Sequence, residues 1–157
     1  MTQENQKDES LASIVFENLK ELLKAKNAAH ESMFKFHWKK LPPFNLIWPQ
    51  VDFLRIIRLM GEIEKHAEEQ KVFIKKNLSK ATEKELPFFK AIPDYLDALV
   101  VSCRALTEIA QFKQDKLEKK EGRSVFSFSK LLKSYENAQD QLVRKGAFVQ
   151  VHWMELN

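Results

Sequence analysis

Apolar side chains recur every three or four residues along four long stretches of this chain. That period places them on one face of an α-helix. Only three glycines and five prolines interrupt the 157 residues, and these are the residues that most often end helices. With 44% hydrophobic and 31% charged residues, the composition is typical of a globular protein. The pattern therefore predicts an all-α protein.

The ends of the stretches carry recognisable helix signals. Ser10 is a good N-cap, Pro42-Pro43 ends the first stretch, and Pro49 suits the first turn of the second. The predicted helices have similar lengths, which favours a four-helix bundle. They span residues 10–40, 49–77, 93–121 and 127–156.

The connection predicted between the second and third helices, residues 78–93, is long for neighbouring antiparallel helices. It contains Thr82 and Glu85 at the spacing of a capping box, which predicts a short helix there. One long crossover is typical of ferritin-like bundles. We therefore predict an all-α, ferritin-like four-helix bundle with one long crossover carrying a short helix. Residues 10–157 would form one domain, and residues 1–9 a disordered tail.

The chain carries few signals of location. Residues 1–9 lack the cationic start and apolar run of a signal peptide, and no segment approaches the roughly 20 apolar residues of a membrane span. The single Cys103 lies in an apolar stripe, which favours a buried, inert thiol in a reducing compartment. We therefore expect a cytoplasmic protein without membrane contact. The net charge of +4 permits contact with DNA but does not require it.

Three metal-competent side chains lie on the first two predicted helices. Glu64 follows His37 by 27 residues, and Glu68 follows it by 31. An imidazole and two carboxylates suit iron, manganese or zinc. His37 lies near the end of the first helix, whereas both glutamates lie well inside an antiparallel second helix. A shared ion would therefore have to bind between two subunits.

Both helices also carry apolar side chains at the edge of the core stripe. On the second helix, Phe53, Ile57 and Gly61 lie beside Glu64 and Glu68, and Gly61 would let another backbone approach. On the first helix, the corresponding edge carries Phe16, Leu23 and Phe34. Apolar surface of this kind often marks an interface, so we expect self-association. A bundle with wide apolar stripes remains the alternative.

The residues around these positions resemble the Dps family, ferritin-like mini-ferritins that protect DNA in starved bacteria. The similarity lies in an aromatic-His-Trp run, a Pro-Phe pair in the following loop, a Glu-x-x-x-Glu run at matching distance, and a C-terminal Trp-Met pair. In this chain they are Phe36-His37-Trp38, Pro43-Phe44, Ile63-Glu64-Lys65-His66-Ala67-Glu68 and Trp153-Met154. The similarity is specific only between about residues 27 and 70.

The resemblance implies a hollow homo-dodecamer that oxidises Fe(II), stores the ferric product and protects against oxidative stress. His37 from one subunit would bind iron together with Glu64 and Glu68 from its two-fold mate. Trp38, beside the site, would intercept oxidising equivalents. Hard oxygen ligands favour Fe(III), which suits a ferroxidase.

Two ligand positions of the family carry other residues here. Pro49 stands where the family has a second His, and Phe53 where it has an Asp, and neither can bind metal. The resemblance therefore implies a weakened ferroxidase centre. Two other functions stay open: a degenerate cage-forming or DNA-associated structural protein without ferroxidase activity, and an unrelated helical protein-interaction module.

Overall fold

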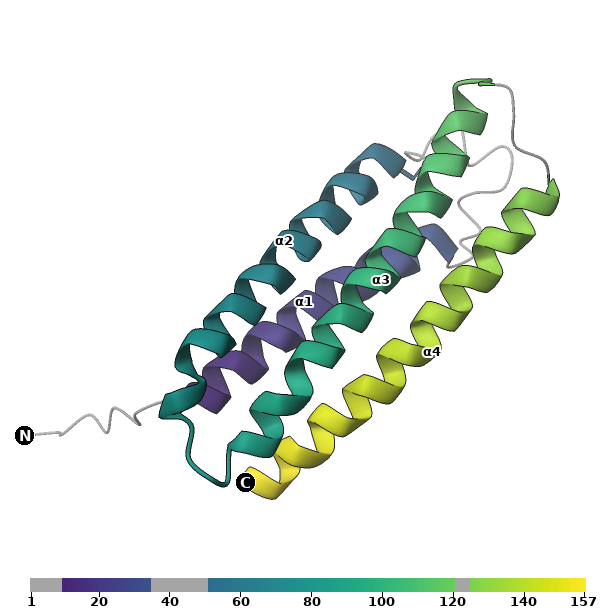
Figure 1. The fold of residues 1–157 in the computed structure, drawn as a ribbon. Coiled ribbons are helices and arrows are strands. Elements are labelled where there is room, and N and C mark those ends of the chain that lie inside the picture. The colour runs from purple at the N-terminus through teal and green to yellow at the C-terminus, as the bar shows by residue number, and fades with distance from the viewer. Residues whose placement is uncertain (1–9, 35–50, 121–124) are drawn as a thin grey trace, which may run out of the picture.

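The computed structural model describes residues 10–34, 51–120 and 125–157, which are mainly helical (Figure 1). No strand occurs among these residues, so the predicted all-α four-helix bundle is confirmed. The elements in chain order are α1 Leu11–Phe34, α2 Phe53–Asn77, the 3-10 helix η3 Leu78–Lys80, α3 Leu86–Leu117 and α4 Val125–Leu156.

Side-chain caps fix where the first two helices begin. Ser13 N donates to Ser10 Oγ over 3.1 Å, which confirms the cap predicted for α1. Arg55 N donates to Asp52 Oδ1 over 2.9 Å, so α2 begins at Phe53. The start predicted near Pro49 was too early, because the cap that satisfies the first free amides lies at Asp52.

Helix α3 begins earlier than predicted. Thr82 and Glu85 do form a capping box: Thr82 N donates to Glu85 Oε2 over 2.9 Å, and Glu85 N donates to Thr82 Oγ1 over 3.4 Å. This box precedes α3 itself, whose first turn accommodates Pro87 because amides there lack helical partners. Pro93 lies inside the helix, so the start predicted near it was wrong.

This early start shortens the connection between α2 and α3 to residues 78–85, including η3. The two helices run antiparallel side by side, and successive long helices alternate in direction (Figure 1). The ferritin-like crossover is therefore not confirmed. The residues predicted as a crossover instead extend α3, which packs extensively against both α2 and α4, whereas α1 packs more sparsely.

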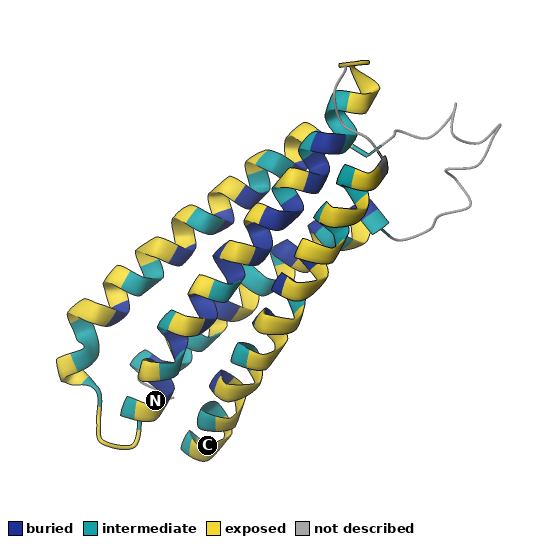
Figure 2. Cartoon of the chain, turned by 45° about the vertical axis from the view of Figure 1, so that its right-hand side comes forward, coloured by how far each residue is buried: buried dark blue, intermediate teal, exposed yellow. Residues whose placement is uncertain are grey.

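The core runs along the centre of the bundle, and α3 supplies much of it (Figure 2). Cys103 is fully buried, as predicted. Two polar side chains, Lys26 and Ser102, are also fully buried. None of the described helices is both long and apolar enough to cross a membrane. The predicted tail and the predicted site residues His37, Trp38 and Pro49 lie outside the described residues.

Candidate functional site

Both glutamates predicted to bind metal form ion pairs on the surface. Arg104 Nε of α3 donates to Glu64 Oε2 over 2.9 Å, and about a quarter of the Glu64 side chain is exposed. Lys71 Nζ donates to Glu68 Oε1 over 3.3 Å and to Asp97 over 2.7 Å. Within the described ranges, no three His, Cys, Asp or Glu side chains group as metal ligands. His37 and Trp38 lie outside these ranges, so the shared site stays a prediction.

The predicted interface on α2 is partly exposed. Phe53 and Ile57 are half-buried against the core, and Gly61 is exposed. A Cβ built on Gly61 would meet no atom within 4 Å. Packing within the described chain therefore does not explain the glycine.

The apolar edge predicted on α1 faces α4 of the same chain. Phe16 stacks on Trp153 with ring centroids 4.2 Å apart and planes 9° apart. Phe34 stacks on Tyr135 with centroids 5.8 Å apart. This part of the self-association argument was wrong, because α4 covers these rings.

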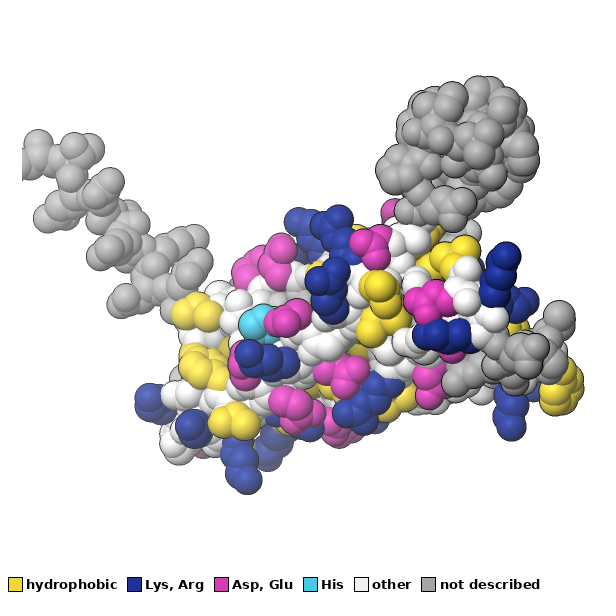
Figure 3. All heavy atoms as spheres, turned by 90° about the horizontal axis from the view of Figure 1, so that it is seen from above, with side chains coloured by type: hydrophobic (Ala, Val, Ile, Leu, Met, Phe, Trp, Pro, Cys, Tyr) yellow, Lys and Arg dark blue, Asp and Glu magenta, His cyan; other side chains and the backbone are white. Residues whose placement is uncertain are grey.

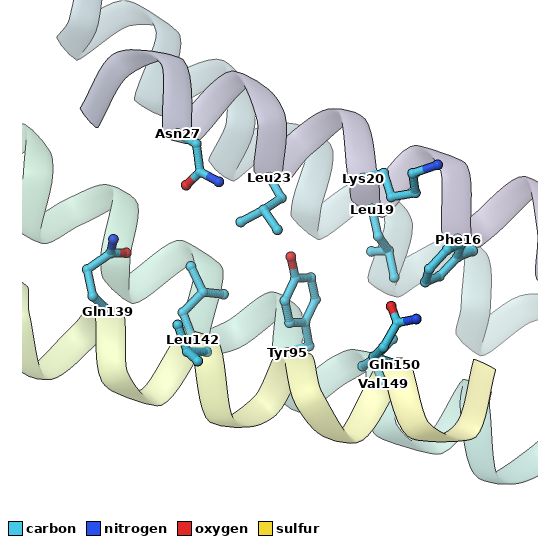
Figure 4. A pocket seen from close by; sticks show the side chains of 12 residues that line it. Phe16, Leu19, Lys20, Leu23, Asn27, Tyr95, Gln139, Leu142, Val149 and Gln150 are labelled. Atoms are coloured by element: carbon cyan, nitrogen blue, oxygen red, sulfur yellow. The ribbon is translucent and has the colours of Figure 1, made fainter. Parts of the chain in front are cut away.

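These two aromatic contacts lie at opposite ends of the seam between α1 and α4, and a cavity of about 310 Å³ lies between them (Figure 4). We call it the seam cavity. Its wall is mainly apolar, with polar side chains at intervals. The lining residues are Phe16, Leu19, Lys20, Leu23, Asn27, Tyr95, Gln139, Leu142, Val143, Gly146, Val149 and Gln150.

Tyr95 places a hydroxyl in this apolar surrounding. Its ring comes from α3, and its hydroxyl points toward α1 near Leu23 (Figure 4). Within the described part of the chain the hydroxyl makes no hydrogen bond. Burial raises the pKa of Tyr95 to about 12, so it stays a neutral donor at physiological pH. Gly146 faces the same ring, because a Cβ there would approach Tyr95 Cε2 to 3.3 Å.

A buried lysine lies next to this cavity. Lys26 Nζ donates a hydrogen bond to Gln139 Oε1 of α4, which also accepts from Ser102 Oγ of α3 over 2.8 Å. Lys26 Nζ also lies 5.1 Å from the centroid of the Tyr135 ring. No carboxylate among the described residues pairs with Lys26. We call Lys26, Ser102, Cys103, Tyr135 and Gln139 the Lys26 network.

Burial shifts the pKa values of three groups in this network. It lowers the pKa of Lys26 from 10.5 to about 8, with a smaller opposing effect of Cys103. It raises the pKa of the Cys103 thiol to about 12 and that of the Tyr135 hydroxyl above its usual range. These shifts follow from the cost of placing charge away from water. The thiol therefore stays protonated, and the amine is partly neutral near neutral pH.

A second cavity of about 350 Å³ opens between α1 and α4 beyond Gln139. His30 and Tyr135 lie in its wall, and His30 Nδ1 is 2.9 Å from the Tyr135 hydroxyl. Burial lowers the pKa of His30, and the Lys26 cation adds to the shift, so His30 is neutral at pH 7. Gln139 lines both cavities, so they adjoin at this residue.

The sequence pattern did not predict the Lys26 network, because the apolar stripe predicted for the first helix does not include Lys26. It follows Leu19 by seven residues and precedes Met33 by seven, which places it on the buried face of α1. A lysine at such a position signals a buried cation or an unusual partner. Ser102 and Gln139 lie on the facing helices at core positions, but only the packing brings them to Lys26.

One face of the described surface carries charges of both signs. On the face drawn in Figure 3, acidic and basic side chains alternate rather than forming one basic patch. Several surface lysines are neutralised locally, such as Lys145, which donates to Asp94 over 3.0 Å. A mixed surface of this kind supports weak, salt-sensitive contacts at most.

Comparisons with known proteins identify no relative of this chain. No family model, no curated protein and no solved structure matches the chain. The candidate site therefore depends on its own geometry: a mainly apolar cavity in the α1–α4 seam, an unpaired hydroxyl within it, and a buried amine beside it.

Proposed function

We propose that the protein binds a small, mainly apolar molecule in the seam cavity, with a hydrogen-bond acceptor directed at Tyr95. The observation that carries the proposal is the Tyr95 hydroxyl, which faces the cavity without a partner among the described residues. The hydroxyl keeps accessible surface in the cavity, so it is within reach of a ligand. A ligand that supplied an acceptor would form a hydrogen bond with it, which contributes about 0.5–1.5 kcal/mol net.

The size and lining of the cavity support the same function. The cavity opens to solvent along one side, where Lys20, Val143 and Gln150 are exposed. The seam cavity has about 310 Å³, near the lower end of the roughly 300–1,000 Å³ found for small-molecule sites. Its leucines and valines would bury an alkyl chain, which contributes about 0.8 kcal/mol per methylene group. Polar atoms at Asn27 and Gln150 would leave the rim wettable.

Octanol is a suitable probe because it combines an alkyl chain with one hydroxyl. We expect saturable binding that raises the unfolding temperature, since a ligand bound only by the folded state stabilises it. Calorimetry should give a negative heat-capacity change, the mark of apolar burial. Leu23→Trp would take up part of the cavity and should weaken octanol binding at least tenfold. The matched control Leu117→Trp changes an exposed leucine on α3 and should leave binding unchanged.

Equal octanol binding by wild type and Leu23→Trp would place the ligand elsewhere. A wild-type protein that shows no saturable binding of octanol, or of the shorter hexanol, would overturn the proposal. Circular dichroism of each variant would confirm that the helical fold is intact.

The second candidate is the Dps-like iron-oxidising cage expected from the resemblance. The observation in its favour is Gly61, exposed on α2 beside Ile57, where an added Cβ would meet no atom within 4 Å, as close approach of a second copy would require. A dodecamer would have a mass of about 220 kDa, from twelve chains of 18.5 kDa. Light scattering on a sizing column tests this mass.

If the mass is that of a dodecamer, two variants test the site. Glu68→Ala should abolish saturable Fe(II) oxidation and leave the assembly intact, because it removes a ligand. Gly61→Arg should break the two-fold interface. A monomer or dimer in solution would exclude the cage, and unchanged oxidation kinetics in Glu68→Ala would exclude the site assignment.

A further inference from the structure

The amine of Lys26 has no role in binding an alcohol, yet its hydrogen-bond partner Gln139 lines two cavities. We propose that Lys26 forms an imine with an apolar aldehyde that occupies the seam cavity. This inference depends on the proposed function, because the aldehyde would occupy the site described for octanol. It adds the chemical class of the ligand, a carbonyl compound, and the atom with which that ligand reacts.

The surroundings of Lys26 Nζ favour the neutral amine that such a reaction requires. An ammonium group has three N–H donors, but the network supplies one acceptor, Gln139 Oε1, and the face of the Tyr135 ring. No carboxylate among the described residues balances the charge. A lysine held in an apolar surrounding is the recurring arrangement for amines that attack carbonyl groups.

Gln139 controls access to the amine. Lys26 is fully buried, and the carboxamide of Gln139 is its hydrogen-bond partner. The same carboxamide lines both cavities, so rotation of this one side chain would connect the amine with the seam cavity. The amide nitrogen of Gln139 makes no hydrogen bond within the described chain, so it could donate to the carbonyl oxygen of the ligand.

The reaction balances without an oxidant or reductant. The lone pair of neutral Nζ attacks the carbonyl carbon, a C–N bond forms as the C=O π bond breaks, and one of the two amine protons passes from nitrogen to oxygen. The C–O bond then breaks, and the oxygen leaves as water with the second nitrogen proton as the C=N bond forms. Tyr135 and His30 form a hydrogen-bonded pair next to the amine, which gives the protons a route toward the second cavity.

Octanal with sodium cyanoborohydride at pH 7 tests the inference, because the hydride reduces each imine to a stable secondary amine. Peptide mapping by mass spectrometry then locates the product. A lysine of pKa about 8 has about 300 times the neutral fraction of one at 10.5 at this pH. We expect octyl modification at Lys26 well above that at Lys24, an exposed lysine on the same helix.

Two lysine variants and competition by octanol test where the octyl product forms. Lys26→Met should remove the dominant product, whereas Lys24→Met should leave it unchanged. Excess octanol should suppress modification at Lys26 and leave the exposed lysines unaffected. The wild-type map alone locates the product, so the test does not require Lys26→Met to fold.

The outcomes separate this inference from the proposed function. Saturable octanol binding together with no preference of octanal for Lys26 would overturn the imine and leave the binding site standing. Absence of both would overturn both. Preferential modification of Lys26 that octanol does not suppress would also overturn the inference, because the aldehyde would then reach the amine from outside the seam cavity.

Discussion

Helices α3 and α1 differ sharply in how they are packed. Helix α3 packs extensively against both α2 and α4, and its inward side chains include Leu96, Leu99 and Leu106, all without exposed surface. Helix α1 has cavities on both flanks: the seam cavity toward α4 and one of about 450 Å³ toward α2. Helix α3 borders a hollow of about 300 Å³ toward α4, but its buried face is closely packed. The two helices therefore differ in how closely their inward faces are packed.

The difference shows why a small bundle can contain a binding site. A closely packed helix gains free energy from burial but leaves no space for a ligand. A sparsely packed helix gives up part of that gain and leaves room, as α1 does around Leu23 and Tyr95. The buried amine of Lys26 lies on α1, where packing is weakest, and not on the apolar face of α3.

The largest expected effect is a truncation in α3. Leu99→Ala should lower the free energy of unfolding by about 3–5 kcal/mol, because the fully buried side chain leaves a void that its neighbours cannot fill. Leu23→Ala should cost about 1 kcal/mol, because this half-buried side chain already borders a cavity. Urea unfolding measures both. Equal losses in the free energy of unfolding would contradict the difference in packing between α3 and α1.

The next effect concerns the buried cation. Lys26→Met should raise the free energy of unfolding at pH 7 by about 1–3 kcal/mol, because an unpaired ammonium is costly to bury. The pKa of Lys26 is about 8 in the folded protein and 10.5 unfolded, so the unfolded chain binds more protons between these values. Wild-type stability should therefore rise with pH across this window, and the gain from Lys26→Met should shrink.

The neighbouring groups act alike in wild type and variant. Burial raises the pKa of Cys103 from 9.0 to about 12, so ionisation of the unfolded thiol opposes the rise in stability above pH 9 in both proteins. The change in the gain from Lys26→Met between pH 7 and pH 9.5, measured by urea unfolding, therefore isolates Lys26. A gain that is the same at both pH values would show that charge burial is not its cause.

A smaller effect should separate folding from binding at the cavity. Tyr95→Phe removes a hydroxyl that has no partner among the described residues, so stability should change by less than about 1 kcal/mol. Octanol affinity should fall about tenfold, the worth of one buried hydrogen bond. Calorimetric titration measures the affinity. Unchanged affinity would remove Tyr95 from the site while leaving the cavity in place.

The smallest effects come from two helical glycines. Gly61→Ala should stabilise the chain by about 0.5–1 kcal/mol through helix propensity, because its surroundings are open. Gly146→Ala should gain less, because the new Cβ would press on Tyr95 at 3.3 Å and shift its ring into the cavity. Only Gly146→Ala should weaken octanol binding. The reverse order of stabilities, by urea unfolding, would contradict this packing.

The sequence was sufficient to predict the helices, because each keeps an apolar face at helical spacing. Ser10, Cys103 and the Thr82–Glu85 capping box all behave as predicted. The predicted connection is too long because Pro93 lies inside α3 and does not begin it. A proline can lie inside a helix where packing offsets the lost hydrogen bond, and Ile92 and Leu96 are fully buried around it.

The candidate site could not be predicted in the same way. Lys26, Ser102 and Gln139 come from three helices, and no spacing along the chain brings them together. The seam cavity depends on how far α1 lies from α4, which a periodic pattern does not specify. The metal site suggested by Glu64 and Glu68 needs His37 of another copy, so a single chain does not test it.

The most direct test of the seam cavity as a binding site is an isotope-filtered NMR experiment with octanol and labelled protein. The account predicts intermolecular nuclear Overhauser effects from the octanol chain to the methyl groups of Leu23 and Leu142 and to the Tyr95 ring. It predicts none to the methyl groups of Leu54 or Val72, which are exposed on α2. Contacts to those surface residues in place of Leu23, Leu142 and Tyr95 would contradict it.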